Sequence, residues 1–197
     1  MLNLFSSFAL CLVIILITNQ KVASQCDLKP TVKDRVSSVT TKTITLAFPF
    51  SDITKNLEVR GLKVMNLDSE TQDYVLIFRV IAISDSELKE GSRILIKGSD
   101  ESIIELSTEE AIVPSLYKVT SGKSYYSLYV PIKLQPTMLE SIAGGGISKV
   151  RIELSFGKDK TYDIGRKASA KFMSLLDCMR KTELNVSKKD SKLYDDF

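Results

Sequence analysis

The chain has 197 residues, of which 44% are hydrophobic and 26% are charged, and this composition excludes a disordered or collagen-like protein. A formal net charge of +3, spread without a dense basic cluster, gives no indication of nucleic-acid binding. The chain contains no histidine, which excludes a Ser-His-Asp triad, a Cys-His pair and the histidine-based zinc motifs. We therefore expect a compact domain that is not an enzyme and that uses no metal or cofactor.

The first 24 residues have the pattern of a secretory signal peptide. Residues 4–17 form an apolar run that is too short for a membrane span, and the small residues Val22 and Ser24 suit a cleavage site. No lysine or arginine precedes the run, so only the terminal amine represents the usual basic region. The expected mature chain begins at Gln25 or one residue later, is secreted or periplasmic, and has no transmembrane helix. An uncleaved signal anchor is the alternative.

Two cysteines remain once the leader is removed, Cys26 near the start and Cys178 near the end. In an exported protein, such a pair predicts a disulfide bond, which here would close the whole domain. Lipid attachment at Cys26 is an alternative, but the sequence ASQC lacks the small residue directly before the cysteine that a lipoprotein site requires. Asn185 begins an NVS sequon and would carry a glycan if the source glycosylates its secreted proteins.

After the leader, most segments alternate apolar and polar residues, which is the pattern of strands that cover a core with one face. The clearest are TITLAFPF (43–50), YYSLYVPIKL (125–134) and KVRIELSF (149–156). Pro131 cannot donate a ladder hydrogen bond, so the second of these is expected at an edge or a bulge.

Other apolar segments predict more strands. The segment 74–83, YVLIFRVIAI, is apolar on nearly both faces and predicts a central strand covered on both sides, interrupted only by Arg79. Around Gly61, LEVRGLKVMNL predicts either a strand pair or one bent strand. RILIK and SIIEL predict a hairpin whose turn runs from Gly98 to Glu101.

Two helices are expected. In QPTMLESIA (135–143), Thr137 would cap the helix and the glycines that follow would end it. RKASAKFMSLLDCMRK (166–181) is longer and amphipathic, and Cys178 is expected at the margin of its apolar stripe, between core and solvent. The stripe comprises Ala168, Phe172, Leu175, Leu176 and Met179.

These elements predict a mostly β protein, either an antiparallel β-sandwich or a curved sheet of about seven to eight strands, with the C-terminal helix packed on it. The expected organisation is a signal peptide at 1–24, one domain at 25–181 and a charged tail at 182–197. The tail is expected to be solvated, because its lysines are offset by aspartates in a stretch of mixed charge.

Three patterns resemble functional motifs, but a plainer interpretation accounts for each. Ser86 with Lys89, and Ser155 with Lys158, have the minimal spacing of Ser-Lys hydrolases but lack the companion motifs. The sequence SGKS from Ser121 is expected to form a hairpin turn rather than a phosphate-binding loop.

The carboxylates Asp68, Glu70 and Asp73, with Asn66, offer oxygen ligands to calcium, but they lack the glycine and the final glutamate of an EF-hand loop. A solvated loop is expected there.

The function that these observations favour is non-catalytic binding of a protein or carbohydrate partner outside the cytoplasm. Tyr125 and Tyr129 are the candidate ligand-binding residues, because both lie on the polar face of one strand with the small Ser127 between them. Packing against cross-strand neighbours is the alternative for both rings. A histidine-independent hydrolase and a structural envelope protein remain the other two function classes.

Overall fold

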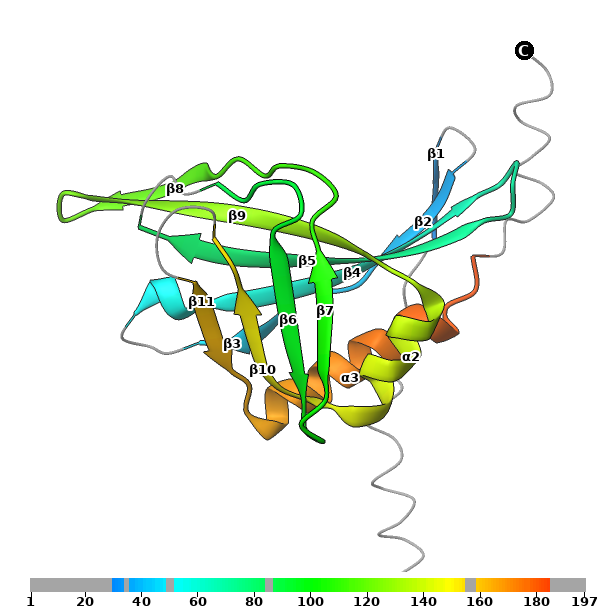
Figure 1. Cartoon of the computed structure of the whole chain (residues 1–197). Coiled ribbons are helices and arrows are strands. Elements are labelled where there is room, and N and C mark those ends of the chain that lie inside the picture. The colour runs from blue at the N-terminus through cyan, green and yellow to red at the C-terminus, as the bar shows by residue number, and fades with distance from the viewer. Residues whose placement is uncertain (1–29, 34–35, 49–51, 84–86, 155–158, 185–197) are drawn as a thin grey trace, which may run out of the picture.

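The computed structural model describes residues 30–33, 36–48, 52–83, 87–154 and 159–184 (Figure 1). In this part of the chain, eleven strands form two antiparallel sheets that are braced by two α-helices. The predicted class, mostly β with a packed C-terminal helix, is confirmed. The additional strands are short or polar, and the alternation of apolar residues was too weak to reveal them.

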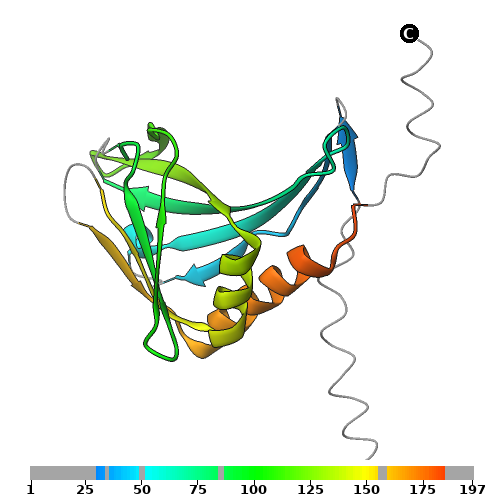
Figure 2. The same ribbon diagram turned by 45° about the vertical axis from the view of Figure 1, so that its right-hand side comes forward.

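The large sheet has seven strands. Their order is β1, β2, β4, β5, β9 and β8, and β3 pairs with β4 beside this path. The long strands β4, β5 and β9 give the sheet its curl (Figure 2). The strands are β1 (Thr31–Lys33), β2 (Val36–Thr40), β3 (Ile44–Ala47), β4 (Leu57–Asn66), β5 (Gln72–Ala82), β8 (Ser115–Thr120) and β9 (Lys123–Leu134).

The small sheet has four strands in the order β11, β10, β6 and β7, and it runs across the long strands of the large sheet (Figure 1). The predicted hairpin of RILIK and SIIEL is confirmed as β6 and β7. The inner faces of both sheets contribute to one hydrophobic cluster, so the two sheets share a core. The strands are β6 (Arg93–Gly98), β7 (Ile103–Ser107), β10 (Ile147–Ile152) and β11 (Lys160–Asp163).

The first α-helix, α2 (Pro136–Gly145), begins earlier than expected. Its N-cap is Gln135, and Thr137 lies inside the helix, so the predicted capping role of Thr137 is wrong. Pro136 explains the shift, because proline holds the residue before it in an extended conformation and is itself suited to the first helical position. Gly146 ends the helix with a φ of 67°, a conformation that favours glycine.

The second α-helix, α3 (Arg166–Lys181), has the predicted bounds and packs its apolar stripe into the core. Cys178 departs from its expected place, because it is only 1% exposed and therefore lies in the interior rather than at the margin. A short 3-10 helix, η3 (Ile53–Lys55), precedes β4. Among the described residues, no helix has the length and apolar character needed to cross a membrane.

The central strand β5 pairs with β4 on one side and β9 on the other, as expected. Its inward residues Leu76, Phe78 and Val80 are fully buried, whereas Val75 and Ile77 on the other face are half-buried. The expectation that both faces are covered therefore holds at Ile81, which is 3% exposed, but not along the rest of the outward side of β5. The face of the large sheet opposite α3 is called the outward face below.

Two other expectations about strands are resolved by the pairing. Residues around Gly61 form one continuous strand, β4, rather than a strand pair, and it pairs with β5 along its length. The strand predicted over 43–50 ends earlier than expected, because β3 stops at Ala47 and Phe48, which follows it, is 54% exposed.

Gly61 is the point at which β4 changes its second neighbour. β3 pairs with β4 at Leu57 to Val59, and β2 pairs with it from Leu62 onward. Between them, the backbone N–H of Gly61 donates to Thr41 Oγ1 and the N–H of Thr41 donates to the Gly61 carbonyl, both at 2.8 Å. On the inner side, a Cβ at Gly61 would lie 2.1 Å from Met179 Sδ, so only glycine admits α3 this closely.

The end of α3 is held by a buried lysine. Lys63, on the inner face of β4, donates from Nζ to the carbonyl of Thr182 at 2.7 Å and lies 5.3 Å from the centre of the Tyr74 ring. Burial lowers the pKa of Lys63 from its usual value. A cation at a helix C-terminus interacts favourably with the helix dipole, so Lys63 fixes where α3 ends against the sheet.

Substitution of Gly61 by alanine tests the close approach of α3. Gly61→Ala is expected to lower the free energy of unfolding by about 1 to 3 kcal/mol, since the added methyl group meets Met179 in a packed core. Met179→Ala in the same chain removes the clash, so the double variant should lose less stability than the sum of the single variants. Urea unfolding measures all three. Gly144→Ala is the control and should lose no stability, because Gly144 lies inside α2 and nothing lies within 4 Å of a Cβ there.

Tyr162 generates a second stability test. Its hydroxyl is buried and has no hydrogen-bond partner among the described residues, and burial raises the pKa of Tyr162 well above its ordinary value of 10.0. The folded state therefore keeps the neutral phenol. The free energy of unfolding does not change with the ionisation of Tyr162 below pH 10, and it falls above pH 10, where this side chain ionises in the unfolded chain. Tyr162→Phe is expected to gain about 1 kcal/mol at pH 7 and to lose less stability above pH 10. Urea unfolding at both pH values decides this, and a loss at pH 7 would show that the hydroxyl is satisfied.

Candidate functional site

Four neighbouring strands bring together a row of side chains on the outward face. Glu58 on β4 is paired with Arg79 on β5, and Arg79 is paired with Tyr129 on β9. Tyr117 joins them from β8, at a bulge between Leu116 and Lys118. We call these four residues, Glu58, Arg79, Tyr117 and Tyr129, the Arg79 cluster.

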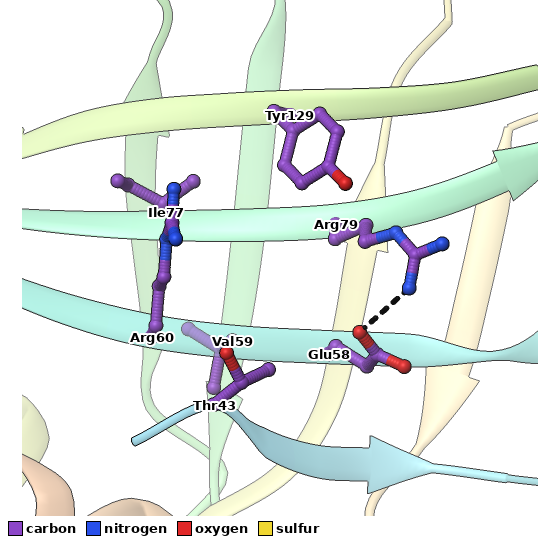
Figure 3. A pocket seen from close by; sticks show the side chains of 7 residues that line it. All are labelled: Thr43, Glu58, Val59, Arg60, Ile77, Arg79 and Tyr129. Atoms are coloured by element: carbon purple, nitrogen blue, oxygen red, sulfur yellow. Dashed lines mark hydrogen bonds and ion pairs between the residues drawn. The ribbon is translucent and has the colours of Figure 1, made fainter. Parts of the chain in front are cut away.

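The Arg79 side chain is held from several sides. Its Nη1 donates to Glu58 Oε2 at 2.9 Å, and the ring of Tyr129 lies near the guanidinium, with 5.8 Å between the guanidinium carbon and the ring centre (Figure 3). The guanidinium carbon also lies 4.7 Å from the centre of the Tyr117 ring. Burial works to lower the pKa of Arg79, but hydrogen bonds to Glu58 and Tyr117 outweigh it and raise that pKa. The guanidinium is therefore a permanent cation in a fixed orientation.

One nitrogen of this cation is left without a partner. Arg79 Nε is buried and makes no hydrogen bond with any described residue, although Nη1 is paired with Glu58. A buried donor without an acceptor is costly, which is unusual in a side chain that is otherwise well held.

A shallow hollow of about 240 Å³ lies beside the Arg79 cluster. Arg60 extends along Ile77 at its rim, is exposed, and forms no ion pair within the described part of the chain (Figure 3). Since Glu58 balances only one of the two arginines, the hollow carries a net positive charge. It is lined by Thr43, Glu58, Val59, Arg60, Ile77, Arg79 and Tyr129.

A second hollow, of about 380 Å³, lies farther along the same face, between β5, β9 and the segment before β8. Lys133 pairs there with Asp73 at 2.9 Å, and this hydrogen bond raises the pKa of Lys133. Glu109 and Glu110 also line the hollow. Within the described ranges, no three histidine, cysteine or carboxylate side chains come together as metal ligands would.

The structure places the two predicted tyrosines differently. Tyr129 is 47% exposed and belongs to the Arg79 cluster, whereas Tyr125 is half-buried and is paired with Lys118 near the end of the hairpin. Ser127 between them is buried, and its hydroxyl lies 3.2 Å from that of Ser115. The two rings therefore do not share an open platform across Ser127, although both lie on the outward face.

Pro131 lies where it was expected. β8 pairs with β9 only from Lys123 to Ser127, so at Pro131 no described strand pairs with β9 on the side away from β5. The missing N–H of proline is therefore tolerated at this edge.

The structure also places the remaining candidate motifs. SGKS forms the predicted hairpin turn, with positive φ values of 50° at Ser121 and 70° at Gly122. The acidic segment after β4 is a hairpin loop in which Asn66 Oδ1 accepts from the N–H of Asp68 at 2.9 Å. Asp73 forms an ion pair with Lys133. Several other candidates lie outside the described residues, namely Cys26, Ser86, Ser155, Lys158 and Asn185.

The Arg79 cluster was only partly visible in the sequence. Arg79 stood out as the single charge in an apolar strand, and that interruption was the available signal. Glu58 and Tyr117 gave none, because their relation to Arg79 depends on which strands are neighbours and in which register. No family model matches the chain, and no curated protein or solved structure matches it either.

Proposed function

We propose that this chain is an exported, non-catalytic binding domain whose recognition surface is the outward face of the large sheet around the Arg79 cluster. The observation that carries the proposal is the fixed guanidinium of Arg79, held by Glu58 between two tyrosine rings on an accessible face. Arginine and tyrosine are, with tryptophan, the residues most enriched at the energetic centres of interfaces.

The way Arg79 is held favours binding over a purely structural role. A side chain that is already immobilised loses little conformational entropy when a ligand arrives, and this lowers the free-energy cost of association. The rings of Tyr117 and Tyr129 are about half exposed, so they offer apolar contact area next to the cation. The partner thus meets aromatic surface and positive charge together.

The charge of the site indicates the chemistry of the ligand. Arg60 has no carboxylate partner among the described residues and lies at the rim of the hollow that Arg79 lines. An anionic group of a protein or carbohydrate partner would find a planar guanidinium suited to paired hydrogen bonds. The leader at 1–24 supports placing this encounter outside the cytoplasm.

Capture of a partner by the mature chain tests the proposal. Immobilised protein that begins at Gln25 is expected to retain a partner from the secreted or envelope fraction of its source, and Tyr129→Ala and Arg60→Ala should each lose that partner. Thermal midpoints should stay within a few degrees, because both side chains lie outside the core.

Two matched variants serve as controls for this experiment. Arg166→Ala removes an exposed arginine at the start of α3, and Tyr125→Ala removes the half-buried tyrosine of the same strand. Both should retain the partner. If Tyr129→Ala still captures it, or if Arg166→Ala loses it equally, the surface around Arg79 is not the site.

A disulfide bond between Cys26 and Cys178 is also expected if the chain is exported. Closing a loop of about 150 residues should stabilise the domain by up to about 5 kcal/mol in the chain-entropy model. Because Cys178 is buried, the bridge requires the start of the mature chain to lie against α3. Non-reducing peptide mapping of exported protein should identify the linked peptides. Two alkylated thiols, or a lipid mass on Cys26, would contradict the bridge.

A further inference from the structure

The outermost strand of the large sheet, β8, has an edge with which no described strand pairs. β8 ends the strand order, and β9 takes its other side. All six residues of β8 are exposed, and the β8–β9 hairpin projects beyond the neighbouring strands (Figure 1). Such an edge presents backbone N–H and C=O groups that an added strand can pair with.

The two faces of β8 differ in chemistry. Leu116 and Val119 pair with Tyr126 and Ser124 on the inward face, and they are 61% and 60% exposed. On the outward face, the bulge places both Lys118 and Tyr117, with the Tyr117 ring over Arg79. An added strand would therefore meet apolar side chains on one face and a cation with an aromatic ring on the other.

The charge of this region favours an acidic added strand over a basic one. No aspartate or glutamate lies between Glu110 and Glu140, whereas lysines occur at 118, 123 and 133. Lys118 and Lys123 form no ion pair with described residues. A second copy of β8 paired antiparallel with Lys118 opposite Lys118 would bring two like charges together, which is destabilising across a strand pair. An acidic strand gains from the same lysine.

We propose that β8 binds an extended segment of another protein as an additional strand, with acidic side chains on the outward face and apolar side chains on the inward face. The inference rests on the proposed function, since the acidic side chains lie on the same face as Arg79. It goes further by naming the partner as a peptide strand. A glycan could bind Lys118, but it lacks the regular row of N–H and C=O groups that an added strand would pair with β8.

A synthetic decapeptide of alternating Asp and Val, blocked at both ends, is the probe, because its two faces have the required chemistry. In calorimetric titration with the full mature protein, we expect it to bind, and the same peptide with Lys in place of Asp should not. Amide hydrogen exchange should slow in Ser115–Thr120 when the Asp-Val peptide is present. Equal binding of both peptides, or unchanged exchange in β8, overturns the proposal.

Charge reversal provides the matched variant. Lys118→Glu should weaken binding of the Asp-Val peptide by about tenfold or more and should create binding of the Lys-Val peptide. Its thermal midpoint should not change, because the side chain is exposed. Lys171→Glu, an exposed lysine on α3, should leave both titrations as in the unaltered protein. A Lys118→Glu variant with unaltered preference overturns the proposal.

N-methylation of the peptide separates strand addition from binding to the face alone. The N–H groups of the Val residues point to one edge of an extended strand and those of the Asp residues to the other. One peptide is N-methylated at its Val residues and the other at its Asp residues. We expect one of these two peptides to lose binding and the other to keep it. If both bind alike, or if sulfated heparin displaces the peptide without slowing exchange in β8, strand addition fails. The proposed function would stand in that case if Tyr129→Ala still lost the captured partner.

Discussion

The close approach of α3 to β4 at Gly61 is the constraint on which the rest of the fold depends. The helix can lie against the strand because Gly61 has no side chain, and Met179 occupies the space that a Cβ would take. Lys63, two residues farther along β4, then holds the C-terminal end of the helix through the carbonyl of Thr182. With α3 fixed there, the inner face of the large sheet is filled by the helix and by the apolar residues of the small sheet, and one continuous core results.

This arrangement determines which side chains remain for recognition. The long strands bury alternate residues inward, so their other residues must face outward. On the outward face only part of the surface is covered, and the row of Glu58, Arg79 and Tyr129 follows from the register of three antiparallel strands. The site is therefore a consequence of the pairing that builds the core, and a shift of one residue would turn Arg79 into the interior.

The edge of β8 with which no described strand pairs has a related origin. β9 is the longest strand, and it pairs with β5 only from Tyr126 to Leu134, so its first residues extend beyond the centre of the sheet. β8 folds back along that extension through the turn at Ser121 and Gly122. The hairpin thus carries exposed apolar residues that no other described strand covers, while Lys118 and the bulge limit unspecific pairing. The length of β9 therefore accounts both for the position of Tyr117 over Arg79 and for the exposed edge of β8.

The sequence by itself determined the class of the fold, the strongest strands, the bounds of α3 and the turns at Gly98 and Ser121. These features depend on local periodicity and on residues with special backbone preferences, and both can be recognised within a short stretch of sequence. The tertiary structure alone decided that Gly61 admits a helix, that Cys178 is buried, and that Tyr129 rather than Tyr125 joins an exposed cluster with Arg79. Each of these depends on contacts between residues distant in the chain, because strand order and register are set by the burial of the whole core rather than by any one segment.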